Sequence, residues 1–294
     1  MNIAIYSRFL KEEHVDFVQH LFDALAERST HLFVFEEYYQ SFKGRVSLAR
    51  IPHSFNNHES FKKQPIDVVI SLGGDGTILD VVTIVRDTGV PIMGINLGRL
   101  GFLAMIEKNR LKQALDMLYN KSYALDQRSV LYLESSPNIF GEKNFALNDF
   151  TILKRDTSSM VIIHTYVNGE FLNSYWADGI IVATPTGSTG YSLSCGGPII
   201  FPKSGNFIIT PVAPHNLNVR PIVLSDTAVI SFEVEGRAKN FLCTLDSRYE
   251  TIDTNFQLAV RKADFEINLI RFTDRNFLYM IREKLKWGID SRNY

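Results

Sequence analysis

The sequence predicts an α/β amino-terminal domain with a doubly wound parallel sheet, followed by a mostly antiparallel, β-sandwich-like domain. Up to residue 122, short apolar runs alternate with amphipathic helical patterns, which is the order of βαβ folds. From about residue 123, apolar and polar residues alternate one by one between turn residues, as in antiparallel strands. The 294 residues, 45% of them hydrophobic, are enough for two packed cores.

The elements of the first domain follow from the spacing of its apolar residues. These recur every three or four positions over 15–25, 78–85 and 111–118, which predicts three amphipathic helices. Gly89 should end the second helix, because glycine readily takes the left-handed conformation found at helix ends. Short apolar runs between the helices predict buried parallel strands at 2–6, 31–35, 66–72 and 90–96.

The second domain shows a period of two in four segments, and each is predicted to be a strand. A last helix, with Phe277, Ile281 and Leu285 at four-residue spacing and Gly288 behind it, resembles the elements of the first domain. We expect that helix to pack back on the first domain. The predicted domains are therefore 1–122 plus about 273–294, and 123–272. The alternating segments are 161–169, 228–236, 240–246 and 265–272.

Charge and composition exclude several kinds of partner. Thirty-one Lys and Arg against 32 Asp and Glu give no basic excess, so we expect no nucleic acid. Gly179–Pro202, the longest uncharged stretch, contains prolines and hydroxyls that argue against a membrane span. Cys195 and Cys243 are too few for a disulfide framework, and the first residues show no signal peptide. We therefore expect a cytoplasmic protein that binds no membrane.

Glycine placement gives the first functional signal. Fourteen of the 18 glycines fall within 73–101 and 169–205. Turn-rich segments can collect glycine without any function, but Gly73 to Thr77 follow a buried strand and open a helix, where backbone N–H groups can hold phosphate oxygens. Asp75 within this turn is either a base or positioning group, a magnesium ligand, or the cap of the helix. The turn fits neither a Walker loop nor a dinucleotide GxGxxG pattern.

Six longer motifs follow one another along the chain: GGDGT (73–77), NLGRLGFLA (96–104), ALND (146–149), DGIIVATPTGSTGYSLSCGGPII (178–200), PVAPHNLNVRPIVL (211–224) and KLKWG (284–288). They resemble those of NAD kinase, in the order of that family and over nearly the whole chain. The resemblance implies transfer of the γ-phosphoryl group of ATP to the adenosine 2′-hydroxyl of NAD, which gives NADP, with a divalent metal ion, expected to be Mg²⁺, whose ligands stay unassigned. It also implies a homodimer or homotetramer.

The resemblance implies a catalytic role for Asp75, which would orient the weakly acidic ribose hydroxyl and accept its proton. Asn148 and Asp149 match the pair that binds the adenosine in the family, which often has Glu in place of Asp149. The alternative is that these two residues form an Asx turn before a strand. The turn residues that would face the phosphates of ATP are Gly73, Gly74, Gly76 and Thr77, and Asp75 and Gly76 would also contact NAD.

Further NAD contacts are implied in the second domain. Asp178 and Ala213 match positions at the nicotinamide end, where they would reach the substrate site of a neighbouring subunit. Ser159, Trp176 and Arg248 match by spacing more than by identity. Residues that line the substrate site in the family match Thr189, Gly190, Tyr191, Ser192, Leu193 and Ser194.

Three further residues of this domain are expected to have packing or turn roles instead. They are His164, His215 and Cys195.

Two other functions compete with this prediction. A diacylglycerol- or sphingosine-type lipid kinase shares GGDGT, but the sequence shows no basic amphipathic helix with which to approach a bilayer. A noncatalytic dinucleotide sensor would keep the pocket without the chemistry. The carboxylate of Asp75 argues against that sensor, because binding gains little from a negative charge beside phosphates.

Overall fold

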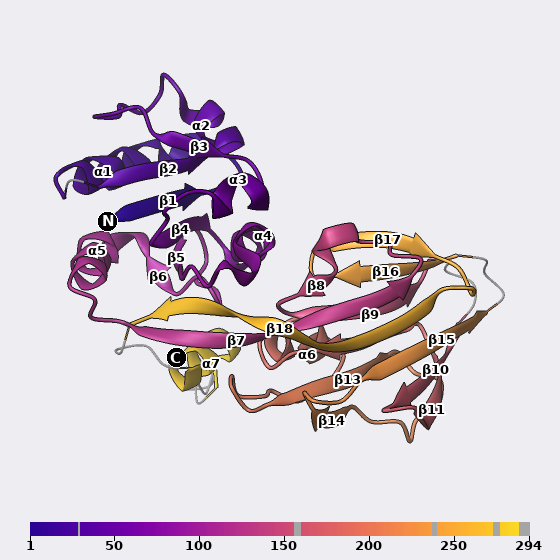
Figure 1. Ribbon diagram of the computed structural model, residues 1–294. Helices are drawn as coiled ribbons and strands as arrows, with labels where there is room; N and C mark the ends of the chain where they lie inside the picture. The colour runs from indigo at the N-terminus through magenta and orange to yellow at the C-terminus, as the bar shows by residue number, and fades with distance from the viewer. Residues whose placement is uncertain (29, 156–159, 237–239, 273–276, 288–294) are drawn as a thin grey trace. The chain divides into compact units, whose positions relative to one another are not determined.

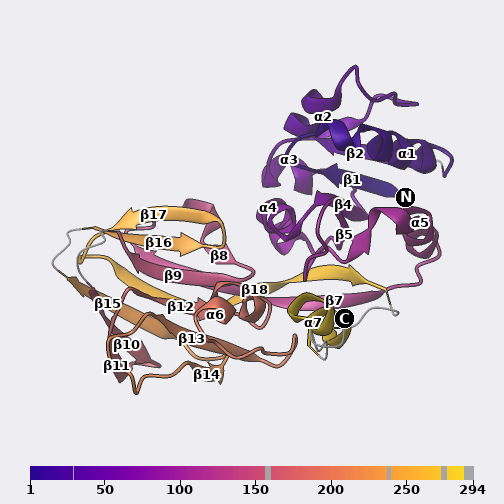
Figure 2. The same ribbon diagram turned by 180° about the vertical axis from the view of Figure 1, so that it is seen from behind.

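The structure is a computed structural model that describes residues 1–28, 30–155, 160–236, 240–272 and 277–287 (Figures 1 and 2). Contacts divide the chain into two compact units. The first consists of Met1–Gln127 with Asn268–Tyr294, and the second is Arg128–Ile267. Within the described ranges, no helix is long and apolar enough to cross a membrane.

The first unit contains the predicted parallel sheet, in the strand order β5-β4-β1-β2-β3. Apolar runs form these strands because their side chains are buried; Ile3, Ala4 and Ile5, for example, have no exposed surface. Leu269, near the end of β18 (Gln257–Arg271), pairs in parallel with Ile92 of β5. The strands are β1 (Asn2–Tyr6), β2 (His31–Phe35), β3 (His53–Phe55), β4 (Val68–Gly73) and β5 (Ile92–Asn96), with the short β6 (Ile106–Glu107) beside β5.

The helices of the first unit include the three predicted ones, α1 (Val15–Ala26), α4 (Asp75–Val85) and α5 (Leu111–Tyr119). Gly89 does adopt the left-handed conformation, but it ends a short 3₁₀ turn that follows α4 rather than α4 itself. Two short helices, α2 (Glu36–Phe42) and α3 (His58–Lys62), were not predicted. The last helix, α7 (Phe277–Leu285), belongs to this unit as expected, and Gly288 lies outside the described residues.

The second unit is a sandwich of two antiparallel sheets. One sheet has the order β14-β13-β12-β9-β16-β17, and the other contains β11-β10-β15-β18, with β7 and β8. Phe150 of β9 packs on Phe232 of β15 with ring centroids 5.6 Å apart, inside a core shared by both sheets. The strands are β7 (Ala124–Ser136), β8 (Phe145–Ala146), β9 (Asp149–Lys154), β10 (Val161–Val167), β11 (Glu170–Ala177), β12 (Gly179–Ala183), β13 (Asn206–Val212), β14 (Ile222–Ser225), β15 (Ile230–Gly236), β16 (Phe241–Leu245) and β17 (Arg248–Ile252).

The six-stranded sheet has a second face, turned away from that core, which we call the outer face. Ile180 and Val182 of β12 point into the shared core, whereas Ile181 and Ala183 point to the outer face, as the alternation of a strand requires. A segment that includes α6 (Tyr191–Ser194) covers this outer face, with Cys195 and Ile200 packed against it. Asp149 pairs with Ala183 and therefore lies on the same face.

Candidate active site

In the first unit, Asp75 opens α4 directly after β4, but it does not cap the helix. Gly74 is the N-cap and makes no side-chain cap hydrogen bond. The carboxylate of Asp75 instead accepts three backbone N–H groups, from Phe102 at 2.8 Å, Leu103 at 3.0 Å and Ala104 at 2.9 Å. The helix-cap alternative is therefore wrong, and Asp75 ties the GGDGT turn to the segment 102–104.

The segment that precedes these N–H groups is shaped to approach Asp75. A Cβ on Gly101 would lie 1.8 Å from Oδ1 of Asp75, so only glycine fits at this position. Asn96, at the end of β5, accepts the N–H of Gly98 at 2.7 Å and donates to the carbonyl of Arg99 at 2.7 Å. The sequence did not predict the close approach of Gly101 to Asp75 or the hydrogen bonds of Asn96, because both depend on how this loop folds.

A cavity of 330 Å³ lies beside the turn. Of the four residues predicted to face the phosphates of ATP, Gly73, Gly74 and Thr77 line this cavity and Gly76 does not. Its lining also includes three basic side chains that sequence reasoning missed, Arg8, Lys11 and Arg99. They come from the chain after β1 and after β5. Both strands are parallel neighbours of β4, so their carboxyl ends meet at one edge of the sheet, which is the signal that could have found them.

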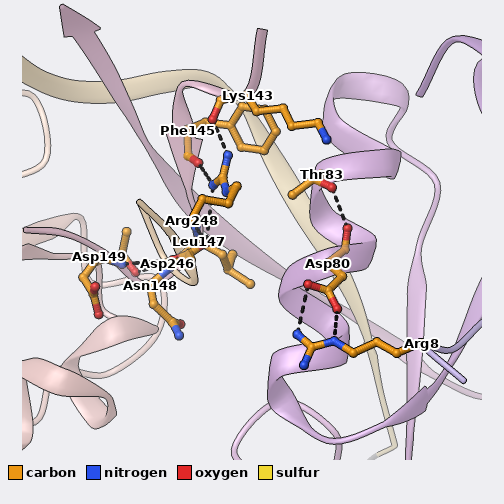
Figure 3. A network of polar contacts seen from close by, with 11 residues as sticks. Arg8, Asp80, Thr83, Lys143, Phe145, Leu147, Asn148, Asp149, Asp246 and Arg248 are labelled. Carbon is orange, nitrogen blue, oxygen red and sulfur yellow. Dashed lines mark hydrogen bonds and ion pairs between the residues drawn. The ribbon is translucent and has the colours of Figure 1, made fainter. Parts of the chain in front are cut away.

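Arg8 is held in place by an acidic residue of α4. Its Nε lies 2.5 Å from Oδ2 of Asp80, and its Nη2 lies 3.1 Å from Oδ1, a two-point pairing shown in Figure 3. Nη2 also donates to the carbonyl of Gly76 at 3.3 Å. The Arg8 side chain is still 52% exposed, so it can also meet a ligand in the cavity.

In the second unit, the segment Leu147–Asn148–Asp149 joins β8 to β9. The carbonyls of Leu147 and Asn148 accept hydrogen bonds from Thr184, through its hydroxyl at 2.6 Å and its backbone N–H at 2.9 Å respectively. Gly187 packs so tightly on Asn148 that a Cβ there would lie 2.1 Å from its carbonyl oxygen. The structure thus brings the ALND and TPTGSTGY segments together.

Asn148 and Asp149 do not form the Asx turn considered as an alternative. Among the described residues, the side-chain amide of half-buried Asn148 has no hydrogen-bond partner. Asp149 is buried, and a Cβ on Gly190 would lie 3.7 Å from its Oδ2. Burial, and to a lesser extent the nearby charge of Asp246, raise the pKa of Asp149 to about 7.

The residues expected to line the NAD site differ in accessibility. Tyr191 is 39% exposed, and Thr189 and Gly190 are half-buried, so these three can meet a ligand. Ser192 is fully buried, and its hydroxyl bonds that of Thr210 at 2.8 Å. In α6, Leu193 is half-buried and Ser194 is exposed. Contact of these residues with NAD stays a prediction.

Asp178 and Ala213, the two residues expected at the nicotinamide end, lie close together, because the backbone N–H of Asp178 donates to the carbonyl of Val212 at 2.9 Å; Trp176, matched by spacing, lies two residues before Asp178. Asp178 forms an ion pair with Lys154, with Nζ 2.6 Å from Oδ1. Ala213 is exposed and has a left-handed φ of 45°. Trp176 is 52% exposed, and its carbonyl accepts the backbone N–H of His215 at 2.8 Å.

Arg248, at the start of β17, lies against backbone in this structure. Its guanidinium donates to the carbonyls of Lys143 and Phe145 and sits 5.4 Å from the centroid of the Phe145 ring (Figure 3). Its predicted contact with NAD stays a prediction. Ser159 lies outside the described residues.

The histidines and the cysteine that we set aside have ordinary surroundings. His164 bonds the hydroxyl of Ser174 at 2.7 Å and lies 3.4 Å from the carboxylate of Glu235. The side chain of Cys195 packs on the outer face, and burial raises the pKa of its thiol. A raised pKa disfavours the thiolate, so Cys195 is poorly suited to act as a nucleophile.

Known proteins match the chain over both units. Residues 3–123 match the family model of the ATP-NAD kinase N-terminal domain, and residues 147–272 match that of the ATP-NAD kinase C-terminal domain. The chain belongs to the ATP-NAD kinase family. NAD kinases of Cytophaga hutchinsonii and Flavobacterium psychrophilum are 47% and 42% identical to it, and each match covers 100% of both chains.

Solved structures with the same fold include other NAD kinases. Yeast NADH kinase complexed with NADH has a TM-score of 0.89 and 22% identity, over 100% of this chain and 89% of the yeast chain. An NAD kinase from Archaeoglobus fulgidus in complex with ATP has a TM-score of 0.73 and 24% identity, over 97% and 99% of the two chains. The predicted family and fold class are confirmed.

Membership in this family makes the chain an enzyme, a kinase that phosphorylates NAD to NADP with ATP. Membership in this family therefore excludes both alternatives considered from the sequence, the lipid kinase and the noncatalytic sensor.

Proposed function

We propose that this NAD kinase transfers the γ-phosphoryl group of ATP to the adenosine 2′-hydroxyl of NAD, with Asp75 as the positioning carboxylate and proton acceptor. The new O2′–P bond forms while the bond between the γ-phosphorus and the β–γ bridging oxygen breaks, and ADP leaves. The proton of the 2′-hydroxyl passes to Asp75 and then to solvent.

The observation that carries this proposal is the state of the Asp75 carboxylate. Three backbone N–H groups fix its position, and a carboxylate has roughly four acceptor sites, so one remains for a ribose hydroxyl. A group fixed in this way can orient a substrate without first losing side-chain freedom. Asp75 would thus serve both to shape the 102–104 segment and to hold the nucleophile.

The phosphates of ATP are proposed to occupy the cavity beside the turn. Gly73 and Gly74 precede the N-terminus of α4, whose free N–H groups and dipole favour anions. Arg8, Lys11 and Arg99 add positive charge to the same cavity. A guanidinium and an ammonium are the side chains that best match phosphate oxygens.

A magnesium ion is proposed to accompany the ATP. Magnesium in phosphotransfer is commonly held by one or two carboxylates together with the phosphates of the nucleotide. Glu13 lines the cavity, and a single carboxylate beside the phosphates is a donor set that fits this mode. In the described ranges, no cluster of three His, Cys, Asp or Glu side chains offers a cage of protein ligands. The ion would neutralise charge that develops on the phosphates.

NAD is proposed to bind through the outer face of the second unit. Asn148 offers a donor and an acceptor without a partner among the described residues, and Asp149, with its pKa near 7, offers a donor when protonated. Tyr191 adds an aromatic face. We also propose a homodimer or homotetramer, in which Asp178 and Ala213 of one subunit reach the substrate of another.

The test is an assay of the purified chain with ATP, magnesium and either NAD or NADH, because the yeast neighbour is an NADH kinase. Product that an NADP-specific dehydrogenase accepts, together with a ³¹P signal of a 2′-phosphate, would support the proposal. Phosphorylation at any other hydroxyl would refute it. Omission of magnesium, with and without added manganese, tests the metal separately.

A further inference from the structure

We propose that Asp246, which lies in none of the family motifs identified in the sequence, is a positioning residue that presents Asn148 and Asp149 to the adenosine of NAD. This inference rests on the proposed function of those two residues. Asp246 occupies the turn between β16 and β17, roughly a hundred residues further along the chain, and it touches the motif only through the backbone (Figure 3).

The contact consists of one carboxylate and three consecutive N–H groups. Oδ2 of Asp246 accepts the N–H of Leu147 at 2.9 Å, and Oδ1 accepts those of Asn148 at 2.8 Å and Asp149 at 3.2 Å. The backbone N–H of Asp246 in turn donates to the carbonyl of Asp149 at 3.0 Å. The Asp246 side chain is only 2% exposed.

These hydrogen bonds satisfy backbone N–H groups that would otherwise lack a partner. Leu147 and Asn148 lie between β8 and β9, so their N–H groups have no place in a strand ladder. Buried N–H groups without partners are costly, and an asparagine at 148 would otherwise tend to satisfy them with its own side chain. Because Asp246 takes these N–H groups, the amide of Asn148 remains available for a ligand.

Arg248, two residues further on, holds the preceding part of the same segment. Its guanidinium donates to the carbonyls of Lys143 and Phe145, while Asp246 accepts from 147–149. Nη2 of Arg248 lies 4.0 Å from Oδ2 of Asp246, which helps to offset the cost of burying the carboxylate. One hairpin turn therefore grips 143–149 through carbonyls at one end and N–H groups at the other.

A carboxylate is needed for this grip, since an amide would not replace it. Asparagine at position 246 would offer one oxygen in place of two and would turn its NH₂ towards a backbone N–H. Burial raises the pKa of Asp246, while the three N–H groups and Arg248 oppose that rise. Asp246→Asn should therefore loosen 147–149 without changing the volume of the side chain.

Asp246 also affects Asp149 through its charge. Burial and the charge of Asp246 together raise the pKa of Asp149, and the charge of Asp149 is in turn one of the causes that raise the pKa of Tyr191 in α6. Removal of the Asp246 charge should therefore lower the pKa of Asp149. A buried carboxylate elsewhere in the unit, such as Asp226, is not expected to move this titration.

The experiment compares Asp246→Asn with the wild-type enzyme and with Asp226→Asn, which alters another buried carboxylate in the second unit, one paired with Lys262 at 2.7 Å. We expect Asp246→Asn to raise KM for NAD roughly 10- to 100-fold, with KM for ATP little changed. Its profile of KM for NAD against pH should shift to lower pH. Asp226→Asn should change neither KM nor the profile.

The proposal is overturned if Asp246→Asn folds, has a normal KM for NAD and shows the same dependence of that KM on pH as the wild-type enzyme. If the variant does not fold, hydrogen exchange of the wild type decides: amides of 147–149 that exchange as fast as exposed loops would also overturn it. If Asn148→Ala leaves NAD binding unchanged, the proposed function of Asn148 fails instead, which is a separate outcome.

Discussion

Gly101 leaves just enough room for the carboxylate of Asp75, since a methyl group at position 101 would lie 1.8 Å from its Oδ1. We therefore expect Gly101→Ala to displace the carboxylate and to lower kcat by at least tenfold, comparable in kind to a change of Asp75 itself. Steady-state assays of NADP formation measure this loss. Gly89→Ala is the matched control: its φ of 73° strains an alanine, so the melting temperature should fall while kcat of the folded enzyme stays normal.

Asp75→Asn removes the carboxylate but keeps its size. We expect kcat to fall roughly 10²- to 10⁴-fold with a modest change in NAD affinity, because the amide cannot accept the ribose proton. The melting temperature should also fall, because the amide satisfies fewer of the three N–H groups. Near-normal turnover in this variant would exclude a catalytic role and leave Asp75 as a loop anchor.

Asn148→Ala should weaken NAD binding by about 1 to 3 kcal/mol, measured by calorimetry, because the adenosine loses its partner. The protein should stay folded, with a melting temperature close to that of the wild type, since the amide has no hydrogen bond to the rest of the described chain. A large drop in melting temperature combined with normal affinity would show that Asn148 acts only in the turn.

The free energy of unfolding should depend on pH through Asp149. Its pKa is about 7 in the folded protein and close to 3.8 in the unfolded chain, so the folded state binds the extra proton between these values. Stability should therefore fall as pH rises from about 4 to 7, by up to roughly 4 kcal/mol from this group. Urea unfolding at a series of pH values measures it. Asp149→Asn should reduce the dependence to the part that comes from Asp246, whose pKa is also raised, whereas Asp226→Asn should keep it in full.

The shared-site proposal makes a prediction about mixed oligomers. Asp75→Asn and Asp178→Ala, each nearly inactive alone, should complement when unfolded together and reassembled. Half of randomly formed dimers are mixed, and one of the two sites in each is intact, so activity should recover to about a quarter of the wild-type level. Mixed dimers, confirmed by native mass spectrometry, without recovered activity would place Asp178 in the site of its own chain.

Sequence patterns predicted the regular elements well and the supporting contacts poorly. The strand at residues 2–6 was predicted with both of its bounds. The side chains of a parallel strand are buried on both faces, so the strand shows in the sequence as a continuous apolar run. The helix α3 was not predicted, because its five residues are too few to show a helical period. Gly89 was predicted to end the helix that became α4, but a 3₁₀ turn lies between that helix and Gly89.

The site shows the same division. Asp75, Asn148 and Asp149 could be proposed from the sequence because they lie in short contiguous motifs. Asp246 was missed because it reaches the motif only after β16 has paired with β9, across nearly a hundred residues of sequence. Arg8 was missed for a similar reason, since β1 and β4 become neighbours only in the sheet.

The grip of Asp246 on 147–149 acts on backbone N–H groups alone, and every residue except proline supplies the same N–H group. Positions 148 and 149 are therefore open to exchange as far as their support is concerned, and an engineer could randomise both while the frame beneath them persists. Asp149 and a longer Glu at the same position would then differ in reach and not in architecture. Substrate preference in such a library would be set by two side chains on a backbone that a distant hairpin keeps constant.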